Sequence, residues 1–233
     1  MREAGASAER QSAGARLSAM GVPGRRDEYW KYTNPATLVQ PQVTPAAAFE
    51  SDEPKVFGDI DRLKLVFVDG QFDATASDDL DMSGIEIERL VTATSRDIHW
   101  ARELYGVLEE RGQTPVDRPL AALNTAFASD GVVIRVTGKP SRPVSLIYQR
   151  DSEDSDATLH HVIRVEGGAE ITVLENGPAA ARFNSVMEID IADGATFHPV
   201  RTQGRDDLRR AAPHLFARLG RHSTSKCFTQ ARS

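Results

Sequence analysis

The feature that most constrains the fold of this chain is a pair of near-copies between His161 and Arg201. Each copy has a short run that alternates apolar and polar residues, a tight glycine-containing turn, an alanine and a second alternating run. Val165 and Ile191 occupy equivalent places 26 positions apart, and a looser upstream copy places Val136 29 positions before Val165. A repeat of this length, built from strands and turns without a helix between them, is typical of coils stacked along an axis.

Alternation divides the first copy between two faces of a coil. We expect an apolar inner face of Ile163, Val165, Ala169, Ile171 and Val173, and a mainly outer set of Glu166, Glu170, Thr172 and Glu175. One coil cannot bury its apolar row alone and needs a coil above and a coil below. An antiparallel meander or sandwich stays open as an alternative, because its hairpins also alternate and turn at glycine. The period favours the β-helix.

The region before the repeat is predicted to mix helices with short strands. Helices are expected over residues 1–20, ended by Gly21, over Ile98–Leu108 with Ser95 as N-cap, and over Leu120–Phe127. Strands are expected from Leu63 to the Asp69-Gly70 turn, at Phe72, and over Ile85–Val91, which could pair with the strand before it. We therefore predict a helical and mixed α+β region over residues 1–130. The start of a β-helix core is predicted over residues 131–233.

The segment Arg25–Pro35 contains three of the six Tyr and Trp residues of the chain. In one interpretation Tyr29, Trp30 and Tyr32 anchor the N-terminal arm by burying their rings. In the other, aromatic rings flanked by Arg and Lys form a patch that binds a partner. The first interpretation is favoured, and the second stays open.

Composition excludes several classes of protein. The hydrophobic content of 40% and charged content of 27% are typical of a globular chain, and a net charge of −6 argues against a nucleic-acid-binding surface. The basic cluster Arg205–Arg210 contains two Asp residues and is interpreted as a solvated turn. The single cysteine, Cys227, fits a reducing compartment. No apolar run is long enough to cross a membrane, and the N-terminal residues lack the apolar core of a secretory signal, so we expect a cytoplasmic protein.

Residues capable of chemistry do not form a recognisable catalytic pattern. The six histidines have no zinc-like spacing with a cysteine, and we interpret His222 and Cys227 as parts of a mobile polar tail. The pair His160-His161 precedes a strand, so alternation should point one ring inward and the other outward. We therefore assign no catalytic, cofactor-binding or metal-binding residue. The chain is expected to be a scaffold, or to act with chemistry that lies on another chain.

One alternative enzyme class needs a pair of carboxylates. Asp190 and Asp193 could serve a polysaccharide-cleaving β-helix. However, Asp193 lies at the turn that matches Gly167, where Asp and Gly are ordinary turn residues. This alternative also lacks a secretion signal, so the scaffold interpretation is preferred.

Several motifs resemble a known family. The segment Arg25–Thr33 is similar to an Arg-x-x-Glu-x-Trp-Lys-Tyr-Thr motif near the N-terminus of SufD, within the SufB/SufD family of the SUF iron–sulfur cluster assembly machinery. Leu65–Gly70, Leu120–Phe127 with Asp130-Gly131, the His160–Glu175 coil and Phe183-Asn184 follow in the order of that family. The resemblance covers nearly all of residues 1 to about 220.

The resemblance implies a fold, partners and a role. It implies an N-terminal helical region followed by a right-handed parallel β-helix, and a non-catalytic scaffold that supports iron acquisition and cluster formation. It also implies pairing with a SufB-like paralogue through the β-helix, and binding of the SufC ATPase through a C-terminal region. The cluster is assembled by the whole complex, and we assign no cofactor to this chain alone. Family members are longer, so we expect this chain to be a C-terminally truncated form whose β-helix is incomplete.

Overall fold

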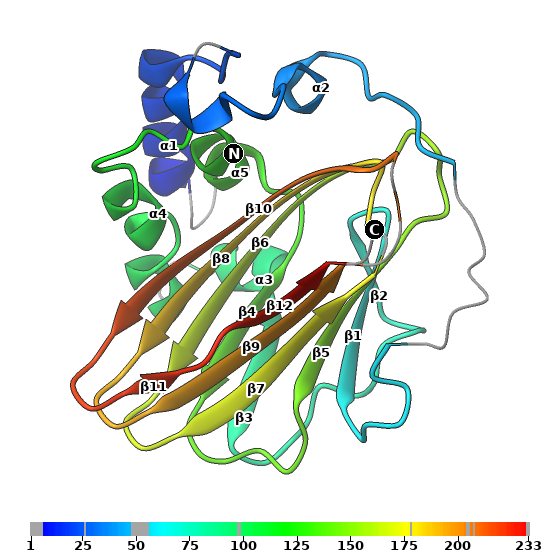
Figure 1. The fold of residues 1–233 in the computed structure, drawn as a ribbon. Coiled ribbons are helices and arrows are strands. Elements are labelled where there is room, and N and C mark those ends of the chain that lie inside the picture. Colours follow the sequence, from blue (N-terminus) through cyan, green and yellow to red (C-terminus); the bar gives the residue numbers. More distant parts are fainter. Residues whose placement is uncertain are drawn as a thin grey trace.

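The centre of the molecule is a parallel β-solenoid of about three turns that follows an N-terminal helix, as the computed structural model in Figure 1 shows. The structure describes residues 7–25, 27–47, 56–96, 99–177, 179–203, 206 and 208–231. From residue 132 to residue 225, successive strands alternate between two facing sheets. The solenoid strands are β4 (Val132–Val136), β5 (Val144–Gln149), β6 (Asp156–Val165), β7 (Glu170–Asn176), β8 (Arg182–Ile191), β9 (Thr196–Gln203), β10 (Arg210–Leu219), β11 (Thr224–Ser225) and β12 (Phe228–Ala231).

Strands from the first part of the chain complete both sheets. The five-stranded sheet has the order β10-β8-β6-β4-β3, where β3 (Ile85–Arg89) pairs antiparallel with β4. The seven-stranded sheet has the order β11-β9-β7-β5-β1-β2, and β12 also pairs with β9. Here β1 (Leu63–Val68) lies parallel to β5, and β2 (Gln71–Asp73) returns antiparallel. The predicted division at residues 130 and 131 stays a prediction, and elements from both sides of it share each sheet.

The predicted period is confirmed by the strand register. Val136 pairs with Val165, Val165 pairs with Ile191, and Ile191 pairs with Leu219, all in parallel strands. The first three of these side chains are at most 1% exposed and belong to the core between the sheets. Parallel pairing between the equivalent runs excludes the antiparallel meander as the architecture of this region.

The inner faces of the two sheets enclose the main apolar core. The five residues predicted to point inward from the first copy are all buried there. The prediction for Glu175 is wrong. It was expected mainly on the outer face, but it is 4% exposed and points into the solenoid. An alternation pattern read through seven positions of β7 puts Glu175 in phase with Val173, and its polar character alone suggested the opposite face.

Helices cover the outer face of the five-stranded sheet (Figure 1). They are α1 (Ser7–Met20), η1 (Glu28–Trp30), α2 (Ala36–Val39), α3 (Leu90–Thr94), η2 (Trp100–Glu103), α4 (Val107–Arg111) and α5 (Pro119–Phe127). A second core forms between the helical layer and the sheet, where Leu104 and Tyr105 pack with Val133 and Val162. The alternation in β4 and β6 therefore serves two cores, one on each face. Among the described residues, no helix has the length and apolar character needed to cross a membrane.

Two predicted helices are confirmed and one is wrong. Helix α1 ends at Gly21, whose φ of 76° closes the helix, and α5 begins with Pro119 in its first turn. The helix expected over Ile98–Leu108 is instead two short pieces, because Gly106 adopts a φ of 74° between η2 and α4. The ring of His99, rather than Ser95, caps η2 by accepting the Ala101 N–H at 3.1 Å. Ile98 lies outside the described residues.

Three smaller expectations are also corrected. Strand β3 pairs with β4 and not with the strand that precedes it. The predicted solvated turn near Asp206 instead buries that residue, whose carboxylate lies 2.7 Å from Arg150, with the two side chains 3% and 1% exposed. The tail interpreted as mobile forms β11 and β12, both parallel to β9.

Candidate functional site

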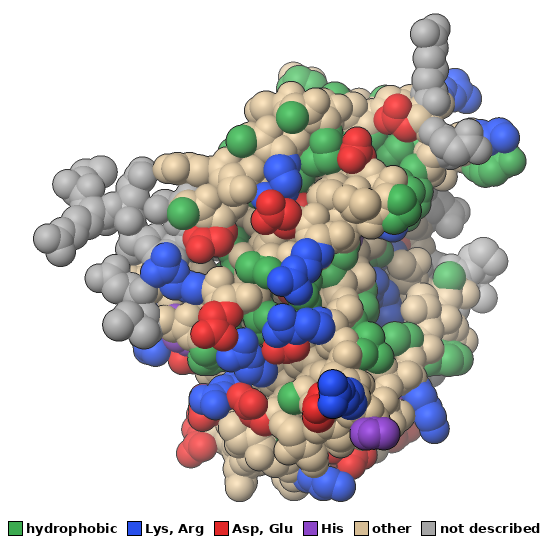
Figure 2. All heavy atoms as spheres, turned by 90° about the vertical axis from the view of Figure 1, so that its left-hand side faces the viewer, with side chains coloured by type: hydrophobic (Ala, Val, Ile, Leu, Met, Phe, Trp, Pro, Cys, Tyr) green, Lys and Arg blue, Asp and Glu red, His purple; other side chains and the backbone are tan. Residues whose placement is uncertain are grey.

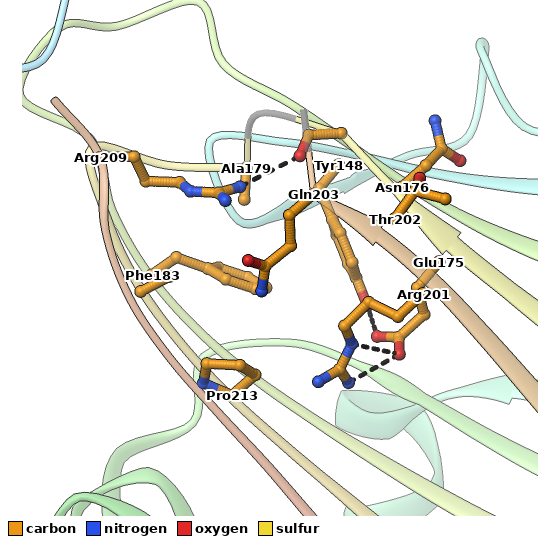
Figure 3. Close-up of a pocket in the computed structure, with 12 residues that line it drawn as sticks. Tyr148, Glu175, Asn176, Ala179, Phe183, Arg201, Thr202, Gln203, Arg209 and Pro213 are labelled. Atoms are coloured by element: carbon orange, nitrogen blue, oxygen red, sulfur yellow. Dashed lines mark hydrogen bonds and ion pairs between the residues drawn. The ribbon is translucent and has the colours of Figure 1, made fainter. Parts of the chain in front are cut away.

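A small cavity of about 30 Å³ lies between the two sheets, beside the ends of β7 and β9 (Figure 3). It has room for about one water molecule. Tyr148, Glu175 and Arg201 line one side, and Phe183 and Pro213 approach from the opposite sheet. Polar groups inside an apolar solenoid need partners, so this cavity and the side chains behind it form the candidate site.

A chain of hydrogen bonds runs from the strand behind the cavity to its wall. The Val132 N–H donates to Nδ1 of His161 at 3.2 Å, which leaves the ring proton on Nε2. Nε2 then donates to the Tyr148 hydroxyl at 3.1 Å, and that hydroxyl donates to Oε1 of Glu175 at 3.0 Å. The direction of every bond in the chain is therefore determined. Because Nε2 carries a proton, this arrangement gives His161 no lone pair to coordinate a metal.

The negative charge of Glu175, at the end of this hydrogen-bonded series, is neutralised by Arg201. Both Nε and Nη2 of Arg201 donate to Oε2 of Glu175, at 2.9 and 2.7 Å. Burial alone lowers the pKa of Arg201, but the Glu175 carboxylate raises that pKa overall. Burial and Glu175 together raise the pKa of Tyr148 well above its usual value, and burial lowers the pKa of His161 to about 3. At neutral pH this series of hydrogen-bonded side chains thus contains one neutral imidazole, one neutral phenol and one ion pair.

The neighbouring histidine points to the other face of β6 and has a different protonation. The amide nitrogen of Asn124 donates to the carbonyls of Leu159 and Asn184, both at 3.0 Å, so its oxygen faces Nδ1 of His160 at 3.0 Å. Nδ1 must therefore carry a proton. Nε2 lies 2.9 Å from Oε2 of Glu188. The prediction that one ring points inward and the other outward is confirmed.

Glu188 joins this cluster to the helical layer. Its carboxylate accepts the N–H groups of Gly106 at 2.6 Å and Glu109 at 2.7 Å, at the start of α4. A strand residue thus supplies the cap for a helix that is 79 positions away in sequence. Glu109 is also fully buried, and its own carboxylate pairs with Arg16 of α1 at 2.5 Å. The hydrogen bonds and the ion pair of this cluster therefore fix α1, α4 and α5 to the sheet.

Asp190 and Asp193 do not form a catalytic pair. Asp190 lies on the outer face of β8, where Arg218 binds both of its carboxylate oxygens at 2.7 Å and Arg164 lies 3.6 Å away. Asp193 accepts the Arg221 N–H at 2.7 Å within a turn. Figure 2 shows basic and acidic side chains interspersed over this side of the molecule. Asp190 therefore belongs to a cross-strand ladder of charges, and the structure gives no support to the polysaccharide-cleaving alternative.

The remaining titratable candidates lie apart from one another. His198 is on β9, His214 is on β10, and His222 lies at a turn with a φ of 56°. Cys227 is exposed, and its Sγ atom lies 3.8 Å from the Ser225 hydroxyl. Among the described residues, no group of three or more His, Cys, Asp or Glu side chains could hold a metal ion. Sequence reasoning missed Tyr148 and Arg201, because their contacts join residues that only the register of the coils brings together.

The aromatic segment of the N-terminal arm is more exposed than the favoured interpretation predicts. Tyr29 is 58% exposed and Tyr32 is 92% exposed, while Trp30 is half-buried. Exposed rings bury little area, so Tyr29 and Tyr32 are not anchors of the kind proposed. Only Trp30 remains a candidate for that role.

Comparison with known proteins adds one finding. The family model described as the SufBD protein N-terminal region matches residues 3–141, which is more than half of the chain. The match ends inside the first coil, between β4 and β5. No curated protein matches the chain.

Proposed function

The chain belongs to the SufBD family, which links it to iron–sulfur cluster assembly, and we propose that it acts there as a non-catalytic scaffold subunit of the SufD type. The SufD assignment is supported by the motifs at Arg25–Thr33 and Leu120–Phe127, both within the matched residues. The proposed place of action is the cytoplasm.

The observation that supports the scaffold role is that the buried polar groups form hydrogen bonds with one another. Inside the solenoid, Tyr148, Glu175 and Arg201 come from three successive coils and bond to one another. A general base or nucleophile needs a reactive atom within reach of a substrate. Here the phenol and the carboxylate are each engaged by a neighbouring coil, which stabilises the stack and leaves neither group poised for catalysis.

The proposed partners are a SufB-like paralogue, bound through the solenoid, and a SufC-like ATPase. We place the ATPase contact in a C-terminal region, as the family resemblance implies. Iron acquisition and cluster formation would then be properties of the complex. The test is co-expression of the tagged chain with the paralogue and the ATPase, each alone and both together. The paralogue should co-purify with the tagged chain, and failure of the paralogue to co-purify in either experiment would overturn the assignment.

A single variant separates scaffolding from catalysis. Tyr148→Phe removes the central hydroxyl of the interior chain without removing the ring. A scaffold with this change should melt at a lower temperature yet still retain its partner and support cluster assembly below that temperature. If the variant stays folded and keeps its partner but assembly is lost, Tyr148 has a chemical role and the non-catalytic proposal is wrong.

A further inference from the structure

Helix α1 packs against α5 and is held there mainly by two arginines (Figure 1). Arg10 donates to two main-chain oxygens at the C-terminal end of α5, at 3.3 and 3.0 Å, and its guanidinium lies 5.7 Å from the centre of the Tyr105 ring. Arg16 lies 2.5 Å from the carboxylate of Glu109. The carbonyl groups at a helix end carry partial negative charge, so a cation is favourable there. We call the surface formed by Tyr105, Glu109 and the end of α5 the α1 site.

Apolar burial contributes little to this attachment. Among the described residues of α1, Ala13 is the one fully buried apolar side chain, and the larger Leu17 and Met20 are half-buried. Burying an alanine methyl removes much less apolar surface from water than burying a leucine side chain. Gly14 lowers the intrinsic stability of the helix further, and isolated helices of this length are marginal in water. Helix α1 therefore depends on its contacts with the α1 site to stay folded.

The fit between α1 and its site is incomplete. An open cavity of about 240 Å³ lies between α1 and α4, with Tyr105 and Val107 in its lining. Among the described residues, three polar atoms of this region are shielded from solvent and have no hydrogen-bond partner: Oε2 of Glu9, Nε of Arg16 and Oγ1 of Thr125. Such atoms are destabilising relative to atoms that are hydrogen-bonded or wet. The α1 site is thus only partly satisfied by the helix that occupies it.

The segment after α1 has the composition of a hinge. Gly21 has a φ of 76°, and Pro23 and Gly24 follow before η1 begins at Glu28. Glycine changes its backbone angles at low cost, so rotation here moves α1 without disturbing η1. The chain can therefore release α1 while the rest of the helical layer stays in place.

The surface that α1 covers selects for positive charge. Glu109 is fully buried, and Glu110 lies 3.7 Å from the same arginine. Among the described side chains, Arg16 is the one cation that pairs with Glu109. A buried carboxylate that loses its partner is strongly destabilising. Once α1 leaves, the α1 site favours any helix that returns a guanidinium to Glu109.

We propose that α1 is a reversible cover, and that the α1 site binds an arginine-bearing helix of a partner protein in its place. That helix sets one guanidinium against Glu109 and another against the end of α5, as Arg16 and Arg10 do. The inference rests on the contacts of α1 and does not depend on the scaffold role. It gives the helical side of the molecule a binding site that is available only after α1 has left.

Hydrogen exchange of the full chain tests whether α1 opens. Amides of α1 should exchange faster than those of β6, because local opening precedes global unfolding. Arg16→Gln should accelerate exchange in α1 about tenfold, which corresponds to about 1.4 kcal/mol, and leave β6 unchanged. Arg111→Gln is the control, since Arg111 is exposed in the last turn of α4. One common exchange rate for α1 and β6, or no effect of Arg16→Gln, would show that α1 is not a reversible cover.

A labelled, capped peptide with the sequence of Ser7–Met20 tests the α1 site as a receptor. Fluorescence anisotropy measures its binding to the full chain. The peptide should bind Arg16→Gln at least tenfold more tightly than the native chain, because the internal competitor is weakened. A matched peptide with Gln in place of both arginines should bind that variant at least tenfold more weakly. Circular dichroism checks the fold of Arg16→Gln, and Arg10→Gln replaces it if it unfolds.

Three outcomes of the peptide experiment overturn the proposal. Equal binding of the two peptides would exclude recognition of arginine. Equal binding to the native chain and to the variant would show that α1 does not compete for the site. Light scattering gives the third outcome: a dimer of the native chain that dissociates in Arg16→Gln would identify a second copy, rather than a different partner, as the source of the helix.

Discussion

Val165 and Ile191 are direct register partners in the parallel strands β6 and β8, and both side chains are buried between the two sheets. The same column continues to Val136 on one side and to Leu219 on the other. One apolar position per coil thus forms a continuous stack, in which Val165 and Ile191 are each covered by the coil before and the coil after, whereas Leu219 at the end of the stack is 57% exposed. The stability of any coil therefore depends on its neighbours.

Shortening a side chain in this column should destabilise the whole solenoid. We expect Ile191→Ala to lower the free energy of unfolding by about 2–5 kcal/mol and Ile191→Val by about 0.5–1.5 kcal/mol, because each leaves a cavity between coils. Chemical denaturation measures both. The control is Val91→Ala, since Val91 is 40% exposed and should change stability by no more than about 0.5 kcal/mol. Equal effects at the two positions would contradict the stacked column.

The coils could be predicted from sequence because their signal is periodic and repeated. Val165 and Ile191 follow the same local pattern, so a single comparison gives both the strands and their register. The helix over Ile98–Leu108 failed for a local reason: apolar spacing alone does not show that Gly106 breaks the turn with a positive φ. Short helical signals are easily overridden in this way.

The polar contacts of the site were not predictable in the same way. Alternation tells which face a residue occupies, but Glu175 is polar and was assigned outward, although its phase in β7 places it inward. Its partners Tyr148 and Arg201 lie 27 and 26 positions away, and only the three-dimensional stack brings them together. A search for a polar residue in phase with an apolar row would have identified Glu175 as a residue in need of buried partners.

His161 should make the protein less stable in acid. Its pKa falls from 6.5 to about 3 in the folded chain, so between these pH values the unfolded state binds more protons. The free energy of unfolding should therefore decrease as the pH falls from 6.5 towards 3. In His161→Gln this slope should be shallower, whereas the exposed His222→Gln should keep it. Denaturant titrations across the pH range measure the slopes, and parallel curves for His161→Gln and the native chain would refute the buried neutral imidazole.

Nuclear magnetic resonance gives an independent check on the same ring. Nitrogen chemical shifts should report a proton on Nε2 and none on Nδ1 of His161 at neutral pH, because Nδ1 accepts from Val132. His160 should instead show a protonated Nδ1. Finding the same tautomer at both positions would contradict the hydrogen-bond directions.

Glu188 should be essential for holding α4 on the sheet. In Glu188→Gln the amide has only one oxygen, so its NH₂ group must face one of two main-chain donors, the N–H group of Gly106 or that of Glu109. Leaving a buried donor unpaired should cost roughly 3 kcal/mol. Hydrogen exchange at Gly106 and Glu109 should accelerate in the variant. Glu110→Gln, whose side chain is 59% exposed, is the control and should leave both rates unchanged.

Two glycines should respond to alanine with opposite signs. Gly131 has a φ of 152°, and a Cβ there would collide with the main-chain oxygen of His160 at the start of the solenoid. Gly131→Ala should therefore destabilise the chain by roughly 3 kcal/mol or more. Gly14 lies inside α1 with open space around its Cβ position, so Gly14→Ala should stabilise by about 0.5–1 kcal/mol. Thermal unfolding of the two variants gives the signs directly, and a tolerated Gly131→Ala would show that β4 does not approach β6 as closely as this register requires.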